Sequence, residues 1–144
     1  MKQLAYILFV LCLTLSACEI ETSNNGQLDG NWQLRTIDTL QTGGICDMSE
    51  SYIYWSVEND LLQLRDIDNN NLKILFRFEK KGDQLNIHSP FKVITKDKLE
   101  ALEDDNLLRP FGIYGTTADF SIEQLNGSQL VLRNEDYRFH FRKY

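Results

Sequence analysis

The sequence predicts an all-β fold in which eight antiparallel strands close into an up-and-down barrel, with one short helix between the fifth and sixth strands. Three observations predict it. Apolar and polar residues alternate with period two, clusters of turn-forming residues separate the alternating segments, and Asn126-Gly127 is a strong hairpin signal. Closure removes the exposed edges that an open sheet would leave.

The first 17 residues have the pattern of a secretory signal peptide. Lys2 provides a positive charge, and residues 4–15 form an uncharged apolar run of 12 residues, too short for a transmembrane helix of about 20. The Leu-Ser-Ala-Cys sequence at 15–18 resembles a bacterial lipobox, which implies that the Cys18 thiol carries diacylglycerol and becomes the new N-terminus. The alternative is a hydrophobic first strand or helix that happens to contain a cysteine.

The residues after Cys18 are polar and include Ser, Asn and Gly, which is typical of a flexible linker. We therefore expect a lipidated cysteine and tether over residues 18–28, followed by one barrel domain over residues 29–144. Glu19 stands where an Asp would favour inner-membrane retention; by resemblance to lipoproteins of enveloped bacteria, this favours the outer membrane. The expected partner is thus the membrane of the bacterial cell envelope, through the N-terminal lipid anchor.

Eight segments have the length and patterning of β-strands. In the clearest one, Leu72, Ile74, Phe76 and Phe78 lie on one face. Pro90 predicts a kink, a bulge or an edge position within the fifth segment. The eight segments are residues 30–37, 52–57, 61–67, 72–79, 84–94, 118–125, 129–133 and 137–142.

The segment between the fifth and sixth strands departs from this pattern. Thr95 can cap a helix whose apolar positions are Leu99 and Leu102. The acidic residues 103–105 near its end oppose the helix dipole, and Pro110 stops it. We therefore expect this helix to be short.

The charge balance argues against a nucleic-acid-binding protein. The chain has 15 Lys and Arg against 21 Asp and Glu, a net charge of −6, whereas binding to phosphates requires a basic surface. His88 and His140 lie on separate predicted strands without the spacing of zinc ligands, and nucleotide-binding and nucleophile motifs are absent from the sequence. We therefore expect no metal, no cofactor and no enzymatic activity.

Cys46 would be the one thiol of the mature chain, because Cys12 leaves with the signal peptide and Cys18 is lipidated. This excludes a disulfide within the mature monomer. The favoured interpretation of Cys46 is a small buried hydrophobic residue, and a reactive thiol is the alternative.

Gly30 and Trp32 form a Gly-x-Trp motif at the start of the first predicted strand. This motif, followed by eight short strands, resembles the lipocalin and calycin barrels, and more narrowly the small lipocalin-like domains of bacterial envelope lipoproteins. The resemblance covers residues 28–144 in outline. It implies that Trp32 closes the narrow end of the barrel and that an Arg of the last strand stacks on it, Arg142 being preferred over Arg138.

The aromatic residues on the predicted strands have two interpretations. They either fill the barrel as a core or line a pocket for one small hydrophobic or amphipathic ligand. The apolar segment 107–114 either covers the mouth of the barrel or forms an exposed contact patch. The candidate ligand or contact residues are Tyr54, Phe76, Phe78, Phe111, Tyr114 and Phe139.

Two functions follow from these interpretations. The first is a lipid-anchored envelope protein that binds a small hydrophobic or amphipathic ligand in its barrel. The second is a protein-interaction module with a filled barrel, for example a periplasmic enzyme inhibitor, whose acidic charge suits a cationic partner. An interior cavity well below the roughly 300 Å³ of typical pockets would favour the second.

Overall fold

The computed structural model describes residues 25–144 of the chain. The predicted signal peptide, the lipidated Cys18 and most of the tether lie outside the described residues. In the part that is described, no helix has the length and apolar character needed to cross a membrane.

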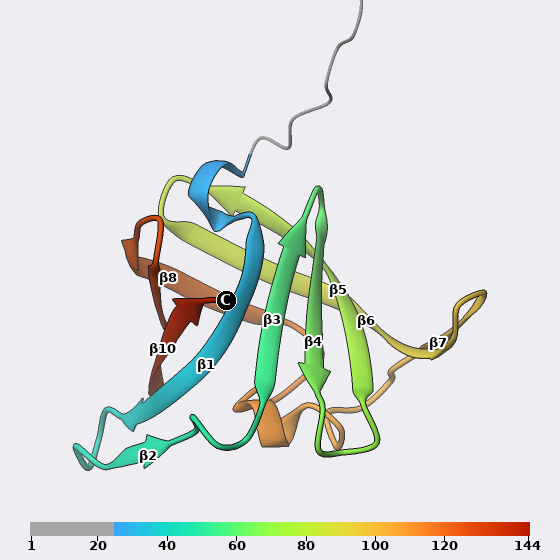
Figure 1. The fold of residues 1–144 in the computed structure, drawn as a ribbon, viewed down its shortest axis with the longest axis horizontal. Helices are drawn as coiled ribbons and strands as arrows, with labels where there is room; N and C mark the ends of the chain where they lie inside the picture. Colours follow the sequence, from blue (N-terminus) through green and yellow to red (C-terminus); the bar gives the residue numbers. More distant parts are fainter. Residues whose placement is uncertain (1–24) are drawn as a thin grey trace, which may run out of the picture.

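Ten antiparallel strands form one sheet that closes into a ring (Figure 1). The sheet runs from β10 through β9, β8, β6, β5, β4 and β3 to β1, and pairing of β10 with β1 closes it. The strands are β1 (Gly30–Thr39), β2 (Ile45–Asp47), β3 (Ile53–Glu58), β4 (Leu61–Asp66), β5 (Leu72–Lys81), β6 (Gln84–Thr95), β7 (Lys98–Ala101), β8 (Ala118–Leu125), β9 (Gln129–Arg133) and β10 (Tyr137–Lys143). The predicted all-β barrel is thereby confirmed.

Buried and exposed residues alternate along the strands of the barrel. In β5, Ile74, Phe76 and Phe78 are buried, whereas Arg77 and Glu79 are exposed. Because successive strand residues point to opposite faces, the apolar set of each strand can be buried inside the ring while the polar set stays in water.

The predicted hairpin at Asn126-Gly127 joins β8 to β9. The Asn126 side-chain oxygen accepts hydrogen bonds from the backbone N–H groups of Ser128 (2.9 Å) and Gln129 (2.8 Å). An Asn side chain that satisfies the backbone two and three residues later stabilises a tight turn, so this prediction is confirmed.

A bulge interrupts the pairing of β5 with β6 near Pro90. The register shifts between Leu75 and Arg77, and Ser89 next to the proline has a positive φ of 54°. Pro90 has no N–H to donate to a strand ladder, so an irregularity at this point is the expected result and the prediction is confirmed.

The prediction of a helix from Thr95 onward is wrong. Thr95 ends β6, and the next residues form β7, which pairs back on β6 with Leu99 opposite Val93. The β6 backbone runs beyond the part paired with β8, which ends at Ile87, so its N–H and C=O groups need another partner. This tertiary requirement outweighs a weak helical pattern with only two apolar positions.

The other additional strand is β2, which pairs with the second half of β1 and brings the count from eight to ten. Cys46 lies on β2 and is exposed, with its Sγ 3.5 Å from the sulfur of Met48. The interpretation of Cys46 as a buried hydrophobic residue is therefore wrong. The helical geometry in the described part is confined to two 3₁₀ turns, η2 (Gly26–Leu28) and η3 (Arg109–Phe111).

Candidate functional site

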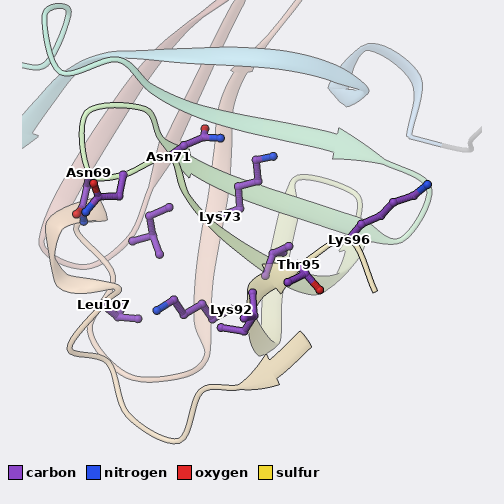
Figure 2. A pocket seen from close by; sticks show the side chains of 11 residues that line it. Asn69, Asn71, Lys73, Lys92, Thr95, Lys96 and Leu107 are labelled. Carbon is purple, nitrogen blue, oxygen red and sulfur yellow. The ribbon is translucent and has the colours of Figure 1, made fainter. Parts of the chain in front are cut away.

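A groove lies at the end of the barrel that carries the β4–β5 connection and η3, opposite the end that carries η2 (Figure 1). We call this end the mouth and the depression the mouth groove. Its volume is about 710 Å³. Figure 2 shows the side chains that line it, which are Asn69, Asn70, Asn71, Leu72, Lys73, Lys92, Val93, Ile94, Thr95, Lys96 and Leu107.

The lining of the mouth groove is amphipathic. Its apolar part comes from Leu72, Val93, Ile94 and Leu107, and two of these, Leu72 and Leu107, pack against the buried core. Its polar part consists of asparagines, one threonine and three lysines, with no carboxylate among the lining residues. The groove can therefore offer an apolar surface and positive charge to one molecule.

The asparagine turn on one side of the groove is held by local hydrogen bonds. Asp66 Oδ1 accepts from the Asn69 backbone N–H at 3.2 Å, and the Leu72 N–H donates to the Asn69 carbonyl at 2.9 Å. Arg65 Nε donates to the Asn71 side-chain oxygen at 2.6 Å. Asn70 and Asn71 both have positive φ, which asparagine tolerates better than most residues. This side of the groove is thus built by turn chemistry.

The apolar segment 107–114 covers the mouth instead of forming an exposed patch. Leu108, Phe111 and Ile113 are each at most 1% exposed and belong to the core cluster. Among the large hydrophobic residues of the segment, Tyr114 at its end is the exposed one, at 58%, and its ring stacks on that of Tyr137. The segment therefore acts as a plug, and we call residues 105–115 the mouth plug.

Asp105 organises the mouth plug. Its carboxylate accepts hydrogen bonds from the Gly115 backbone N–H (2.8 Å) and from Arg109 Nε (3.0 Å), so it joins the two ends of the segment. Its backbone carbonyl also accepts from the N–H groups of Leu108 and Arg109. The Gly115 hydrogen bond, with help from Arg109, lowers the pKa of the Asp105 carboxyl below its ordinary value.

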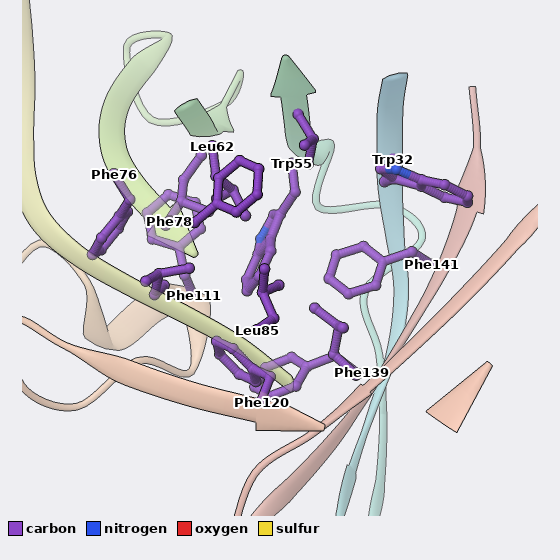
Figure 3. Close-up of a cluster of buried hydrophobic side chains, with 14 of the residues drawn as sticks. Trp32, Trp55, Leu62, Phe76, Phe78, Leu85, Phe111, Phe120, Phe139 and Phe141 are labelled. Atoms are coloured by element: carbon purple, nitrogen blue, oxygen red, sulfur yellow. The ribbon is translucent and has the colours of Figure 1, made fainter. Parts of the chain in front are cut away.

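Aromatic side chains occupy the interior of the barrel (Figure 3). The Trp55 ring lies 5.0 Å from Phe141, 5.8 Å from Phe120 and 6.0 Å from Phe139, measured between ring centroids. Aromatic rings at these distances are in contact. The structure thus favours the core interpretation of the interior aromatics over the pocket interpretation.

Four of the six candidate ligand residues belong to this core, namely Phe76, Phe78, Phe111 and Phe139. Tyr54 does not, because it alternates with the inward-facing Ile53 and Trp55 and packs against Tyr144 at 5.3 Å. Burial of its phenol, together with Tyr144, raises the Tyr54 pKa. The structure therefore places Tyr54 on the opposite face of the sheet from the interior.

One donor inside the barrel has no acceptor. Trp55 is 1% exposed, and its Nε1 is the one buried side-chain nitrogen or oxygen without a hydrogen-bond partner among residues 25–144. A buried donor of this kind costs about 1–3 kcal/mol relative to a paired one.

Trp32 lies at the closed end, near η2, and is fully buried. Its Nε1 donates to the Leu28 carbonyl at 2.8 Å. The cation over its ring is Lys143, with Nζ 4.9 Å from the centroid, and not the expected Arg142. Arg142 is opposite Gln33 in the β1–β10 register, and its side chain is exposed. The expectation chose the wrong face, since Lys143 is the residue opposite Trp32 in the β1–β10 register.

Gly30 is needed for this closure. Its φ is 128°, a conformation that side chains rarely adopt, and a Cβ there would lie 2.6 Å from Cε of Lys143. The Lys143 side chain therefore crosses the backbone at Gly30, and its Nζ also donates to the Gln27 carbonyl at 3.2 Å. Gly30, Trp32 and Lys143 form a structural closure and are remote from the mouth groove.

A second, smaller groove of about 460 Å³ lies against β8 and the β9–β10 turn. Its lining is mainly polar, with Gln84, Asp119, Ser121, Glu123 and Arg133 among its residues. It carries both signs of charge and serves below as a comparison site.

The lysines of the mouth groove were not among the residues predicted from the sequence. Lys73 and Lys92 are 19 residues apart and come to neighbouring positions at one groove because β5 and β6 form a hairpin around the Gly82 turn. A register counted from that turn could have brought them together, but the bulge at Pro90 shifts the count. In the described part of the chain, His, Cys, Asp and Glu side chains form no group of three that could hold a metal ion.

Comparison with known proteins is consistent with this geometry. A solved lipocalin-like protein from Bacteroides uniformis matches with a TM-score of 0.65 and 21% identity, over 83% of this chain and 100% of that one. An uncharacterized protein from Bacteroides eggerthii matches with a TM-score of 0.58 and 17% identity, over 81% and 99%. No curated protein matches the chain. The family described as lipocalin-like domain matches residues 12–144, and the chain therefore belongs to the lipocalin-like domain family.

Proposed function

We propose that this protein is a lipid-anchored protein of the bacterial cell envelope that binds a small hydrophobic or amphipathic molecule in the mouth groove. The observation that carries the proposal is the groove itself. Its volume of about 710 Å³ lies within the range of roughly 300–1,000 Å³ that is typical of small-molecule sites, and its lining combines apolar and polar groups. The lipocalin-like barrel is a ligand-binding type of fold.

Because the interior of the barrel is packed with side chains, we propose the binding site at the mouth and not along the barrel axis. Trp55, Phe120 and Phe139 are in mutual ring contact in the middle of the barrel. The mouth groove, in contrast, is open, and its Leu72 and Leu107 continue the core outward. An apolar group bound there would extend the core and remove apolar surface from water, at about 25 cal/mol for each Å² buried.

The lipid anchor is supported by the sequence. The apolar run at 4–15 and the lipobox-like residues 15–18 precede a polar tether that ends where the barrel begins. An anchored barrel would meet amphipathic molecules at high local concentration near the membrane surface. Binding, and not catalysis, is proposed because lipocalin-like domains are generally non-enzymatic.

Titration with N-phenyl-1-naphthylamine, an uncharged apolar dye, tests the groove. The variant Thr95→Trp fills the groove from an exposed position, so it should weaken dye binding by about tenfold or more, since a loss of 1.4 kcal/mol is tenfold. The matched control Gln84→Trp lies at the other end of β6, in the second groove, and should bind like the unchanged protein. Absence of dye binding, or equal binding by Thr95→Trp, contradicts the proposal.

A protein-interaction module is the second candidate, and the packed interior favours it. The segment 107–114 cannot be its contact surface, because Leu108, Phe111 and Ile113 are buried. Exposed apolar residues occur instead on the β6–β7 hairpin, where Ile94 is 39% and Leu99 52% exposed. If this candidate is correct, Leu99→Ser should abolish recovery of an envelope partner, while dye binding is absent.

A further inference from the structure

We propose that the ligand of the mouth groove is an anionic amphiphile, a molecule with a carboxylate or phosphate head group on an apolar chain. This inference rests on the proposed function and adds the chemical class of the ligand. It is carried by three lysines, Lys73, Lys92 and Lys96, that line the groove together with four aliphatic side chains.

The groove is positive in a protein that is negative overall. The chain has a net charge of −6, yet the lining residues include three lysines and no carboxylate. Charges that line a concave surface with low-dielectric walls attract a counter-ion more strongly than the same charges on an open surface. An anionic head group is therefore the complement of this site, although it would be repelled by most of the remaining surface.

The three lysines are not neutralised by other side chains. Within residues 25–144, every ion pair of an acidic residue is made with an arginine or with His140, and the side chains of the three lysines form neither an ion pair nor a hydrogen bond. The nearest carboxylate in the strand register is Glu100, which is opposite Lys92 across the β6–β7 pair without forming an ion pair with it. The ammonium groups are thus available to a ligand.

Lys92 is placed where the head group and the chain of a ligand would meet. It is opposite Ile74 in the β5–β6 register, so it shares the sheet face of a fully buried core residue, and it is itself half-buried. In Figure 2 its ammonium end extends toward Leu107. A lysine whose aliphatic stem lies on an apolar surface holds its ammonium group at the edge of that surface. The head group of an amphiphile whose chain covers the same surface would lie at this edge.

The other polar side chains can contribute to the same head group. Arg65 Nε donates to the Asn71 side-chain oxygen at 2.6 Å, which leaves the Asn71 amide nitrogen as a donor beside the groove. Thr95 adds a hydroxyl donor. Carboxylate and phosphate oxygens accept hydrogen bonds from such groups, and charge-assisted bonds of this kind are about twice as strong as neutral ones.

Isothermal titration calorimetry with four matched compounds tests the inference. The full chain is held in nanodiscs of zwitterionic lipid, and the heat from empty discs is subtracted. Decanoate has head and chain, decanol has the chain without the charge, acetate has the head without the chain, and decyltrimethylammonium reverses the charge. We expect decanoate to bind about fivefold more tightly than decanol, and the cation most weakly, because one lysine–carboxylate pair contributes up to about 1 kcal/mol.

The lysine dependence is tested with K73Q, K92Q and K96Q combined. This variant should lose the preference for decanoate over decanol, because the charges that distinguish the two compounds are removed. The matched control is K80Q with K81Q, two exposed lysines at the opposite end of β5, and it should retain the preference. Raising the salt concentration should weaken decanoate binding by the unchanged protein and leave decanol binding unaffected.

The outcomes separate failure of this inference from failure of the proposed function. Equal binding of decanoate and decanol overturns the anionic head group and leaves the groove as a binding site. Acetate binding as tightly as decanoate shows a simple anion site and overturns the amphiphile. Binding of neither decyl compound overturns both proposals. A preference for dihexanoylphosphatidylglycerol over decanoate supports the inference and identifies a phospholipid as the source, and the reverse preference identifies a fatty acid.

Discussion

The two tryptophans show that the contribution of a buried side chain to stability depends on its hydrogen-bond partner. Both are fully buried, to 0% and 1% exposure, and both stand on neighbouring strands, with Trp32 opposite Trp55 in the β1–β3 register. Trp32 donates its indole N–H to the Leu28 carbonyl and carries Lys143 over its ring. Trp55 makes three aromatic contacts but leaves its N–H unpaired among the described residues.

Trp32→Phe should destabilise the protein by roughly 1–3 kcal/mol more than Trp55→Phe. Both changes remove a similar volume from the core, but Trp32→Phe also leaves the Leu28 carbonyl without its donor, whereas Trp55→Phe removes a donor that has no acceptor. Urea denaturation of each variant, compared with the unchanged protein, measures the difference. Equal losses, or a larger loss for Trp55→Phe, would show that the Trp55 N–H has an acceptor in solution.

Among the structural elements, the mouth plug both packs against the core and lines the mouth groove. Leu108, Phe111 and Ile113 add it to the core, and Asp105 ties its beginning to Gly115 at its end. Leu107 at the same segment lines the mouth groove. Loosening of the plug would therefore change the shape of the groove, which makes the Asp105 contacts relevant to binding.

Acid should loosen the mouth plug through Asp105. Since the Asp105 pKa in the folded protein is below its ordinary value of 3.8, its stabilising contribution is complete above that value and is lost as the pH falls through the lower, folded pKa. The protection factor of the Gly115 amide, which is its intrinsic exchange rate divided by the observed rate at the same pH, should therefore fall below about pH 4. Asp105→Asn should give fast exchange already at neutral pH, because one carboxylate acceptor becomes a donor.

The neighbouring variant Asp104→Asn is the control for that measurement. Asp104 accepts only a local hydrogen bond from the Asn106 N–H, at 3.0 Å, and does not reach Gly115. Exchange at Gly115 should be unchanged in this variant. If Asp105→Asn behaves in the same way, Asp105 does not hold the plug.

In the molecule as a whole, the two ends of the barrel differ in structure. The end near η2 is closed by Trp32, Gly30 and Lys143, and the described part of the chain begins there at residue 25. The opposite end carries the mouth groove and its plug. A protein anchored through residue 18 would thus be attached at its closed end, with the mouth at the far end of the barrel.

Cys18→Ala should abolish acylation and move the protein from the membrane fraction to the soluble fraction of the cell. The physical reason is that each buried CH₂ of an acyl chain contributes about 0.8 kcal/mol, so stable anchoring requires the chains that Cys18 is predicted to carry. Metabolic labelling with an alkyne-tagged palmitate, followed by fractionation, measures both effects. Cys46→Ala, at an exposed thiol of the barrel, should keep label and location, and acylation of Cys18→Ala would contradict the predicted anchor.

Much of the barrel could be predicted from the sequence, because its signals are local. The β5 alternation of Ile74, Phe76 and Phe78 and the Asn126 turn each depend on a few adjacent residues, and both are seen in the structure. Pro90 was correctly expected to interrupt a strand. Local propensity failed at Thr95, where the free edge of β6 requires a pairing partner and draws the chain into β7.

The all-β class and the strand pattern follow from the amino-acid sequence alone, since periodicity and turn chemistry act over neighbouring residues, and the closing role of Trp32 follows from the resemblance of its Gly-x-Trp motif to lipocalin barrels. Three features appear only in the folded molecule: the filled interior, Lys143 in place of Arg142 over Trp32, and the groove shared by Lys73, Lys92 and Lys96. These features depend on strand register and on a bulge, and a shift of one residue exchanges the faces of a strand.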